Sequence, residues 1–327
     1  MDKQKQPIRM VMVGAGDIAR KAYLPVLRTL PGTELAGIYS RTQASVDAVC
    51  RDWQVDFGTT DLDALIAQKP QVAFVLTKTT VHFEQVKQLL LAGIDVYVEK
   101  PATVDSSETR ELAELAQQQQ RLFMVGFNRR YALLYKQAKD LFAGRRIQMI
   151  IAEKHRPTAF HVSLYNNYVD DTIHQIDLLR FYCPDMTPLF TTFQQEQGRI
   201  FGAMSVMELP EGGKAVVQTS LQAGAWQERL TIHGDKLTVE VDAFRQMRVK
   251  YPDHEEVYGN DRPGRWLSEL RERGFYGEVE HFLDCVRERK QPYPDGFEAA
   301  RTQELVEALT RQAGQDTEFL PYAEGAI

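Results

Sequence analysis

The sequence lacks the features of membrane, secreted and metal-binding proteins. No apolar run approaches the roughly 18 residues that a membrane-spanning helix needs, and the N-terminal segment MDKQKQPIRM has no apolar stretch like that of a secretory signal. The three cysteines, Cys50, Cys183 and Cys285, are scattered without the spacing of a metal site or a disulfide framework. These absences predict a cytoplasmic protein with reduced thiols, without a metal and without a membrane partner.

The chain also has fewer basic than acidic residues. The chain has 39 Lys and Arg residues against 45 Asp and Glu residues, which gives a net charge of -6. This balance argues against nucleic acid or an anionic membrane as a partner. The length of 327 residues exceeds the roughly 250–300 residues at which a single core stops growing, so two domains are expected.

The first third of the chain alternates strand and helix patterns. Apolar segments predict strands at 8–13, 34–40, 72–77, 95–98 and 122–127, and amphipathic segments predict helices at 45–53, 81–93 and 105–118. This alternation predicts an α/β domain over residues 1–127, with a doubly wound parallel sheet of the Rossmann type covered on both faces. Ligands of such sheets bind beyond the carboxyl ends of the strands.

A glycine motif follows the first predicted strand and indicates the ligand. The segment GAGDIA places Gly14, Gly16 and Ala19 in a G-x-G-x-x-A pattern between a strand and a helix. Such a turn lets the backbone approach a dinucleotide pyrophosphate. The predicted cofactor-binding residues of this turn are Gly14, Ala15, Gly16, Asp17 and Ile18. The alternative is a tight turn in an α/β fold that binds no nucleotide.

The end of the second strand bears on the choice of dinucleotide. Sites for NAD usually carry Asp or Glu there, whereas this chain has Ser40 and Arg41. A hydroxyl and a guanidinium suit a 2′-phosphate, so NADP is expected to be preferred over NAD. The alternative is that Arg41 is solvated and that Ser40 or Thr42 caps the next helix.

After residue 127 the pattern changes to one of short strands with helices around them. Helices are predicted at 130–142, 170–182, 276–289 and 297–312, and strands at 147–156, 189–195, 200–209, 215–222, 227–234 and 236–244. Turn signals separate these strands. Residues 128–327 are therefore expected to form an α+β domain with a mostly antiparallel open sheet.

The segment DDTIHQID carries candidate acid/base chemistry. On a helix, Asp170 and His174 are four residues apart and share a face, so the carboxylate can orient the imidazole as a general base. Two alternatives remain. One is that the acidic residues suit the N-terminal end of a helix, beside a core or surface histidine. The other is a metal site in which Asp171 and Asp177 join Asp170 and His174, although no second His or Cys lies at ligand spacing.

Four segments together carry a family resemblance. VMVGAGDIA, VYVEKP, MVGFNRRY and the Asp170–His174–Asp177 pattern resemble the Gfo/Idh/MocA oxidoreductases, and EKHR and DDTIHQIDLLRF resemble their MviM-like bacterial branch. The resemblance spans nearly the whole chain. It implies a dinucleotide domain followed by an open-sheet domain that carries substrate contacts and often subunit contacts.

The resemblance also implies roles for individual residues. Lys100 of the E-K-P signature would bind the substrate hydroxyl beside the nicotinamide, with His174 as acid/base and Asp170 as its support. Further implied cofactor-binding residues are Thr77, Thr79, His82, Glu99, Lys100 and Asn128. Implied substrate residues are Lys100, Arg130, Lys154, Tyr168, Asp170 and His174. The chain departs from the family in having Lys78 where proline is usual, and Thr172 where glycine is usual.

The resemblance implies an NAD(P)-dependent dehydrogenase or reductase acting on a secondary alcohol or ketone of a sugar, polyol or related metabolite. Two alternatives are NAD-assisted elimination or glycoside cleavage, and a non-catalytic dinucleotide-sensing regulatory protein. Apolar residues of the late strands, such as Val206, Val216, Val217 and Leu221, predict a flat face that pairs subunits in a homodimer or homotetramer. The alternative is that the two C-terminal helices cover this face.

Overall fold

The computed structural model describes residues 6–259, 266 and 268–320, and the chain divides into two compact units. Unit 1 comprises residues 1–127 and 275–300, and unit 2 comprises residues 128–274 and 301–327. The first change of unit lies between Phe127 and Asn128, where the sequence analysis places its boundary. Residues 275–300 differ from that prediction, because they return to unit 1 instead of staying in the C-terminal domain.

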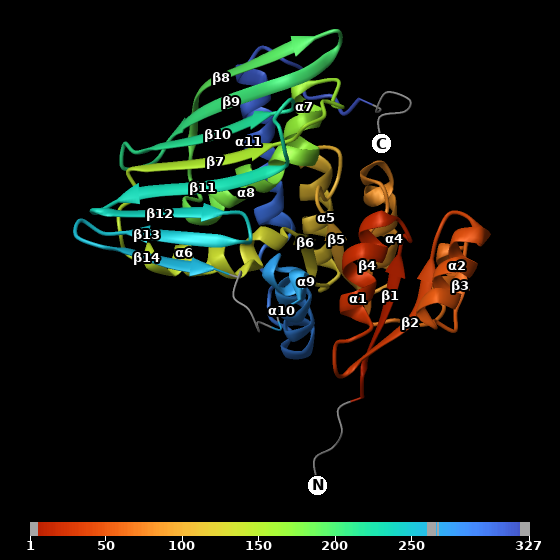
Figure 1. The fold of residues 1–327 in the computed structure, drawn as a ribbon. Helices are drawn as coiled ribbons and strands as arrows, with labels where there is room; N and C mark the ends of the chain where they lie inside the picture. The colour runs from red at the N-terminus through yellow and green to blue at the C-terminus, as the bar shows by residue number, and fades with distance from the viewer. Residues whose placement is uncertain (1–5, 260–265, 267, 321–327) are drawn as a thin grey trace. The chain divides into compact units, whose positions relative to one another are not determined.

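Unit 1 contains a six-stranded parallel sheet (Figure 1). Its strands are β1 (Ile8–Val13), β2 (Thr33–Tyr39), β3 (Gly58–Thr59), β4 (Val72–Val75), β5 (Asp95–Glu99) and β6 (Phe123–Gly126). The strand order is β3-β2-β1-β4-β5-β6, and every neighbouring pair is parallel. The order reverses at β1, so the predicted doubly wound sheet is confirmed and its ligand edge lies beyond the end of β1.

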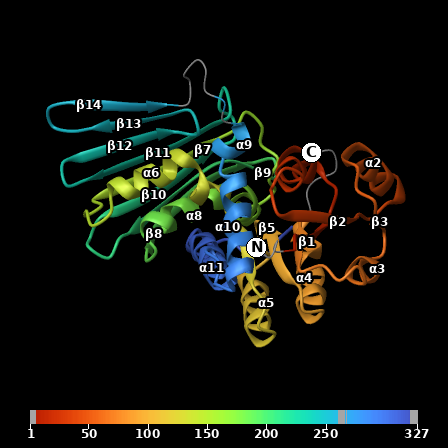
Figure 2. The same ribbon diagram turned by 90° about the horizontal axis from the view of Figure 1, so that it is seen from below.

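The helices of unit 1 connect these strands. They are η1 (Ala19–Tyr23), α1 (Leu24–Leu27), α2 (Gln43–Trp53), α3 (Leu62–Ile66), η2 (Thr79–Val81), α4 (His82–Leu91), α5 (Ser106–Gln118) and α10 (Phe275–Glu288). Helices α4 and α5 lie side by side (Figure 2). The Asp105 side chain accepts a hydrogen bond from the backbone N–H of Glu108 at 2.9 Å and so caps α5, as its spacing predicts.

Aromatic packing explains why α10 belongs to unit 1. The ring of Phe275 lies 5.6 Å from the ring of Tyr23, and the ring of Phe282 lies 6.0 Å from that of Phe74 and 5.8 Å from that of Tyr97. All five side chains are buried. Burial of each such ring contributes on the order of 2 kcal/mol, so the core of unit 1 depends on a helix from the far end of the sequence.

Unit 2 is built on an eight-stranded sheet. Its strands are β7 (Met149–His155), β8 (Thr187–Glu196), β9 (Arg199–Glu208), β10 (Lys214–Ser220), β11 (Gln227–Gly234), β12 (Leu237–Asp242), β13 (Gln246–Lys250) and β14 (Glu255–Gly259). The strand order is β14-β13-β12-β11-β7-β10-β9-β8, with one parallel pair, β7 and β10, among antiparallel neighbours. The predicted antiparallel open sheet is confirmed, but the sequence analysis missed β13 and β14.

The helices of unit 2 differ in detail from the predicted ones. They are η3 (Asn128–Tyr131), α6 (Leu133–Leu141), α7 (Leu164–Asn166), η4 (Asn167–Thr172), α8 (Ile173–Tyr182), α9 (Glu269–Glu272) and most of α11 (Gly296–Gln312). The predicted helix 130–142 is interrupted at Ala132, whose backbone is extended. The predicted helix 170–182 begins inside the π-helical η4 and continues as α8. No helix in the described part of the chain is long and apolar enough to cross a membrane.

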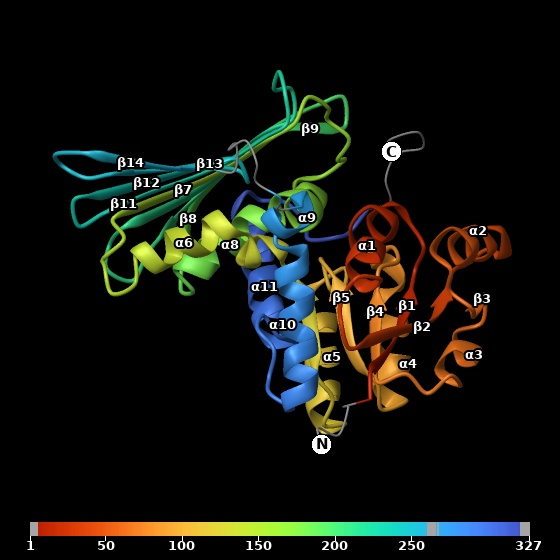
Figure 3. The same cartoon turned by 60° about the horizontal axis from the view of Figure 1, so that its bottom comes forward.

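Helices cover one face of the eight-stranded sheet. Helices α6 and α8 pack on this face, and among the described residues of unit 2 no helix lies on the opposite one (Figure 3). Because neighbouring residues of a strand point to opposite faces, Val217 is buried under the helices whereas Val206 and Val216 lie on the open face. Leu221, which follows β10, is also fully buried. The four residues predicted to form one flat face therefore do not share a face. Val206 and Val216 lie on the open face, whereas Val217 and Leu221 are buried.

Candidate active site

The glycine turn of unit 1 has the geometry that a dinucleotide requires. Gly14 has a φ of +111°, and a Cβ there would lie 2.7 Å from the carbonyl carbon and oxygen of Leu76, so only glycine fits. A Cβ built on Gly16 meets no atom within 4 Å, so the backbone at that position is open to an approaching group. Ile18 is exposed. These residues fit the pyrophosphate of NAD or NADP.

The polar residues that follow β2 were predicted either to cap the next helix or to bind the cofactor, and their contacts differ. Thr42 accepts a hydrogen bond from the backbone N–H of Ser45 at 3.4 Å, so it caps α2. Ser40 is half-buried, and Arg41 is exposed, with no hydrogen bond or ion pair from any residue that the structure describes. The helix-capping interpretation therefore accounts for Thr42 and leaves the guanidinium of Arg41 open to a ligand.

His82 links the segments that follow two strands of unit 1. Its Nε2 lies 3.1 Å from the carbonyl oxygen of Thr77 and its Nδ1 lies 3.1 Å from that of Pro101, which follow β4 and β5. The side chain is 1% exposed. Burial lowers the pKa of His82 to about 4, despite its contacts with backbone carbonyls. His82 therefore braces two loops, and its direct contact with the cofactor stays a prediction.

Lys100 follows β5 directly, at the carboxyl edge of the parallel sheet. The preceding Glu99 accepts a hydrogen bond from the Tyr23 hydroxyl at 2.7 Å. Thr77, at the end of β4, donates a hydrogen bond to Gln85 at 2.6 Å, and Thr79 begins η2. The residues of the E-K-P signature and of the loop after β4 thus lie at the sheet edge that carries Gly14, as the sequence analysis places them.

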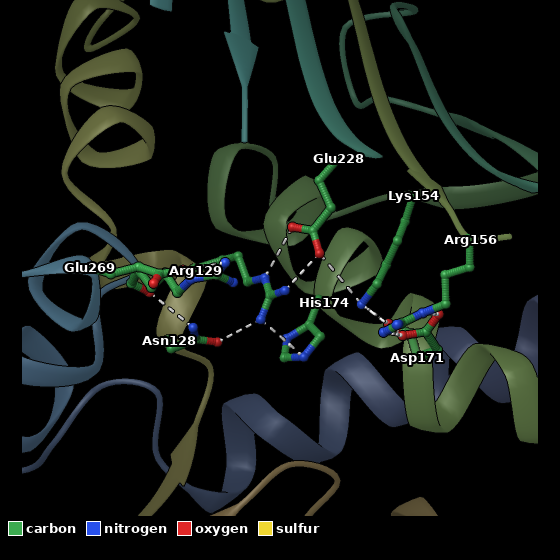
Figure 4. Close-up of polar contacts among 9 residues, drawn as sticks. Asn128, Arg129, Lys154, Arg156, Asp171, His174, Glu228 and Glu269 are labelled. Carbon is green, nitrogen blue, oxygen red and sulfur yellow. Dashed lines mark hydrogen bonds and ion pairs between the residues drawn. The ribbon is translucent and has the colours of Figure 1, made fainter. Parts of the chain in front are cut away.

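Unit 2 contains a buried network of ion pairs, here named the charged cluster, shown in Figure 4. It consists of Arg129, Lys154, Arg156, Asp171 and Glu228. Arg129 pairs with Glu228 at 2.6 Å, Lys154 lies 2.8 Å from Asp171 and 3.5 Å from Glu228, and Arg156 pairs with Asp171 at 2.6 Å. The network runs from half-buried Arg156 to the fully buried carboxylate of Glu228.

Burial removes the charged groups of the cluster from solvating water, and their opposite charges stabilise one another instead. Burial alone would raise the pKa of Asp171, but the neighbouring ammonium of Lys154 and guanidinium of Arg156 outweigh burial and lower it. The pKa of Glu228 is lowered in the same way, mainly by Arg129 and Lys154. Burial lowers the pKa of Lys154, although the two carboxylates oppose that effect. Removing one partner would leave a buried charge uncompensated.

His174 lies at one end of this network. It belongs to α8, is mostly buried, and has its Nε2 3.1 Å from Nη1 of Arg129. Asp170, its predicted partner, has a carboxylate oxygen 3.5 Å from Nε2 of His161. Asp170 lies in the π-helical η4, whose wider turn alters the four-residue spacing on which the pairing was argued. The support of His174 by Asp170 stays a prediction.

Three residues implied to contact substrate point into the interior of unit 2. Tyr168 is fully buried, with its hydroxyl 2.8 Å from that of Ser205. Arg130 is buried and donates two hydrogen bonds to Asp177, at 2.8 and 2.6 Å. The ammonium of Lys154 is 1% exposed and directs its donors at the charged cluster. Each side chain has polar partners inside unit 2, and the substrate contacts of the three residues stay predictions.

Asn128, implied to bind cofactor, also has internal partners. Its Nδ2 donates to the carbonyl oxygen of Arg273 at 2.9 Å, and its Oδ1 accepts from Nη1 of Arg129 at 2.9 Å. The side chain is buried. The structure therefore places Asn128 as a support of Arg129 within unit 2.

The sequence analysis missed Arg129 and Glu228, although the strand pattern contains a signal for one of them. Lys154 and Glu228 face each other in register across β7 and β11. They occupy inward positions that otherwise carry apolar residues such as Ala152 and Leu230. Opposite charges at two inward strand positions indicate a buried ion pair.

Comparison with known proteins identifies the family to which the chain belongs. Residues 8–127 match the family profile described as an oxidoreductase family with an NAD-binding Rossmann fold, and residues 168–321 match that family's C-terminal alpha/beta domain. The oxidoreductase YceM of Salmonella typhimurium is 31% identical over 312 residues, which cover 94% of this chain and 98% of YceM. The chain belongs to the Gfo/Idh/MocA oxidoreductase family.

Two further known proteins are similar to this Gfo/Idh/MocA oxidoreductase over nearly its whole length. Inositol 2-dehydrogenase of Rhizobium meliloti is 21% identical over 328 residues, covering 94% of this chain and 97% of the relative. The crystal structure of a dehydrogenase (MviM) from Clostridium difficile has a TM-score of 0.86 and 25% identity, and the match covers 93% of this chain and 99% of that chain. The expected family, the two-part fold and the class of NAD(P)-dependent oxidoreductase are confirmed.

Proposed function

We propose that this oxidoreductase transfers a hydride between NADP and a secondary alcohol or ketone of a sugar or polyol. The observation that carries the proposal is the glycine turn, where Gly14 excludes any side chain and Gly16 leaves the backbone open for a pyrophosphate. The polyol class is supported by the relation to an inositol 2-dehydrogenase over nearly the full length of both chains.

Lys100 and His174 are the residues proposed to carry the chemistry. The hydride chemistry itself is what a bound nicotinamide supplies. Lys100 holds the reacting oxygen and stabilises negative charge that develops on it, and His174 exchanges the proton of that oxygen. Asp170 supports the charge of the imidazole. Binding of both reactants in the correct geometry contributes much of the acceleration.

The preference for NADP rests on Arg41. Its guanidinium follows β2 by two residues, is exposed, and makes no hydrogen bond or ion pair to the described part of the chain. Arginine binds phosphate through two parallel hydrogen bonds, so Arg41 suits the 2′-phosphate that distinguishes NADP from NAD. Ser40 adds a hydroxyl beside it.

Titration calorimetry with NADPH and NADH tests the proposal before any substrate is known. NADPH should bind more tightly, and Arg41→Ala should weaken NADPH binding by about 1.5–3 kcal/mol, the usual range for hydrogen bonds to charged groups, while NADH binding changes little. Arg51→Ala, in the exposed last turn of α2, is the matched control. A panel of sugars and polyols with NADP⁺, followed by the absorbance of reduced nicotinamide, then tests turnover. Binding of neither dinucleotide would contradict the proposal.

A further inference from the structure

The contact between Arg129 and His174 defines the protonation state of the imidazole. Nη1 of Arg129 lies 3.1 Å from Nε2 of His174. A guanidinium has only donors, so Nε2 can take part in this hydrogen bond only as an acceptor without a proton. A neutral imidazole then carries its proton on Nδ1. We infer that Arg129, anchored by Glu228, is a positioning residue that holds His174 in the tautomer protonated on Nδ1.

The donors of Arg129 leave little freedom for another arrangement. Nε and Nη2 donate to the two carboxylate oxygens of Glu228, at 3.2 and 2.6 Å. One hydrogen of Nη1 goes to Oδ1 of Asn128 at 2.9 Å. The Asn128 amide is itself oriented, because its Nδ2 donates to the carbonyl oxygen of Arg273 at 2.9 Å. The second hydrogen of Nη1 is therefore the one directed at His174, and Figure 4 draws this contact as a dashed line.

Glu228 anchors Arg129, and Glu228 is itself held in place by a second cation. Glu228 is 0% exposed, and Lys154 lies 3.5 Å from the same carboxylate. Lys154 is held in turn by Asp171 at 2.8 Å, and Asp171 by Arg156. A bidentate guanidinium–carboxylate pair fixes both distance and plane. The other members of the charged cluster therefore act on His174 through Arg129.

This inference deepens the proposed function, on which its consequence rests. With Nε2 accepting a hydrogen bond from a guanidinium, that nitrogen cannot take a proton from a substrate hydroxyl. Proton uptake at Nε2 requires the imidazole to leave Arg129, so release of this contact is expected to precede the action of His174 as a base.

Heteronuclear NMR of the histidine rings tests the tautomer without substrate or turnover. Ring nitrogens with and without a proton have separate chemical shifts, and the chain has only seven histidines. A His174→Gln variant assigns the signals. In the wild-type protein at neutral pH, Nδ1 of His174 should be protonated and Nε2 should not. Arg129→Met should remove this preference, Arg129→Lys should restore part of it, and exposed His254 is the control in the same spectra.

The outcomes separate this inference from the proposed function. A wild-type His174 protonated on Nε2 overturns the inference and leaves dinucleotide binding by unit 1 unaffected. Unchanged His174 signals in folded Arg129→Met overturn it as well. If that variant does not fold, the wild-type spectrum still decides the tautomer. Failure of the proposed function appears instead as absent NADPH binding with the Nδ1 tautomer intact.

Discussion

At the scale of single residues, His82 links two loops through carbonyl groups that can only accept hydrogen bonds. A neutral imidazole has one N–H, so it satisfies the carbonyl of Thr77 or that of Pro101, but not both at once. Protonation would satisfy both, but burial disfavours the charged ring and lowers its pKa to about 4. His82 therefore stays neutral while it holds the segment that carries Lys100.

The lowered pKa of His82 predicts a loss of stability in mild acid. The unfolded chain titrates near 6.5 and the folded ring near 4, so between these values the unfolded state binds more protons. Stability should fall as the pH decreases through this window, by on the order of 3 kcal/mol in full. Urea denaturation at several pH values should show a shallower pH dependence for His82→Gln than for wild type. His254→Gln, at an exposed site, should keep the wild-type dependence; equal slopes for wild type and His82→Gln would contradict the assignment.

The proposed chemistry predicts separable effects of two substitutions. With a substrate in hand, Lys100→Met and His174→Ala should each lower turnover by on the order of 10²–10⁴, the usual size of a lost acid/base or oxyanion contact. NADPH affinity should change far less. Steady-state kinetics and calorimetry measure the two quantities, with Lys87→Met on the surface of α4 as control. Near-normal turnover in His174→Ala would place the acid/base group elsewhere.

At the scale of elements, strands and helices were largely predictable because their periodicity is local. The run of β1, the capping of α5 by Asp105 and the alternation in β11 are each contained within a short segment. The partner of Lys154 was not predictable in this way, since Glu228 reaches it only through the pairing of β7 with β11. The sequence analysis therefore did not identify Lys154 as part of a buried ion pair.

The local geometry of η4 shows a second limit of sequence patterns. The segment around Asp170 was predicted as helical, and it is, but a π-helical turn replaces the regular one. The period of a π-helical turn differs from the 3.6 residues of an α-helix, so residues four apart in the sequence no longer lie on the same face. Sequence patterns contain no rule for such a turn, so the contact of His174 with Arg129 could not be derived from spacing.

The charge balance of the cluster predicts which substitution destabilises unit 2 more. Three cations face two carboxylates, so Lys154→Met leaves two neutral pairs, whereas Glu228→Gln leaves three cations around Asp171. Glu228→Gln should cost about 3–5 kcal/mol, the usual cost of breaking a buried pair, and Lys154→Met clearly less. Urea denaturation of both variants measures the difference, with Lys214→Met, half of an exposed pair, as control. The reverse order would show that the cluster is not governed by its charge balance.

At the scale of the whole molecule, the open face of the eight-stranded sheet carries an apolar row. Phe190, Val206, Val216 and Ile151 face one another in register across β8, β9, β10 and β7. Phe190 is 52% exposed. The C-terminal helix α11 lies on the other side, because its Gln312 contacts the buried Thr191 of the helix-covered face. An uncovered apolar face of this kind favours a second copy of the chain as its partner.

Assembly through this row is therefore expected, as a homodimer or a dimer of dimers. Light scattering at micromolar concentration should give a mass of at least two chains. Val216→Lys should dissociate the assembly, because a desolvated ammonium in an apolar interface has no partner. Leu91→Lys, at an exposed apolar residue of α4 in unit 1, should not. A monomeric wild-type protein would disprove this assembly.

The return of residues 275–300 to unit 1 has a consequence for synthesis on the ribosome. When Phe127 emerges, the rings of Tyr23, Phe74 and Tyr97 still lack Phe275 and Phe282. All of residues 128–274 must be translated first, which takes on the order of ten seconds at usual elongation rates. The nascent nucleotide-binding unit is therefore expected to expose these three rings to solvent during that interval.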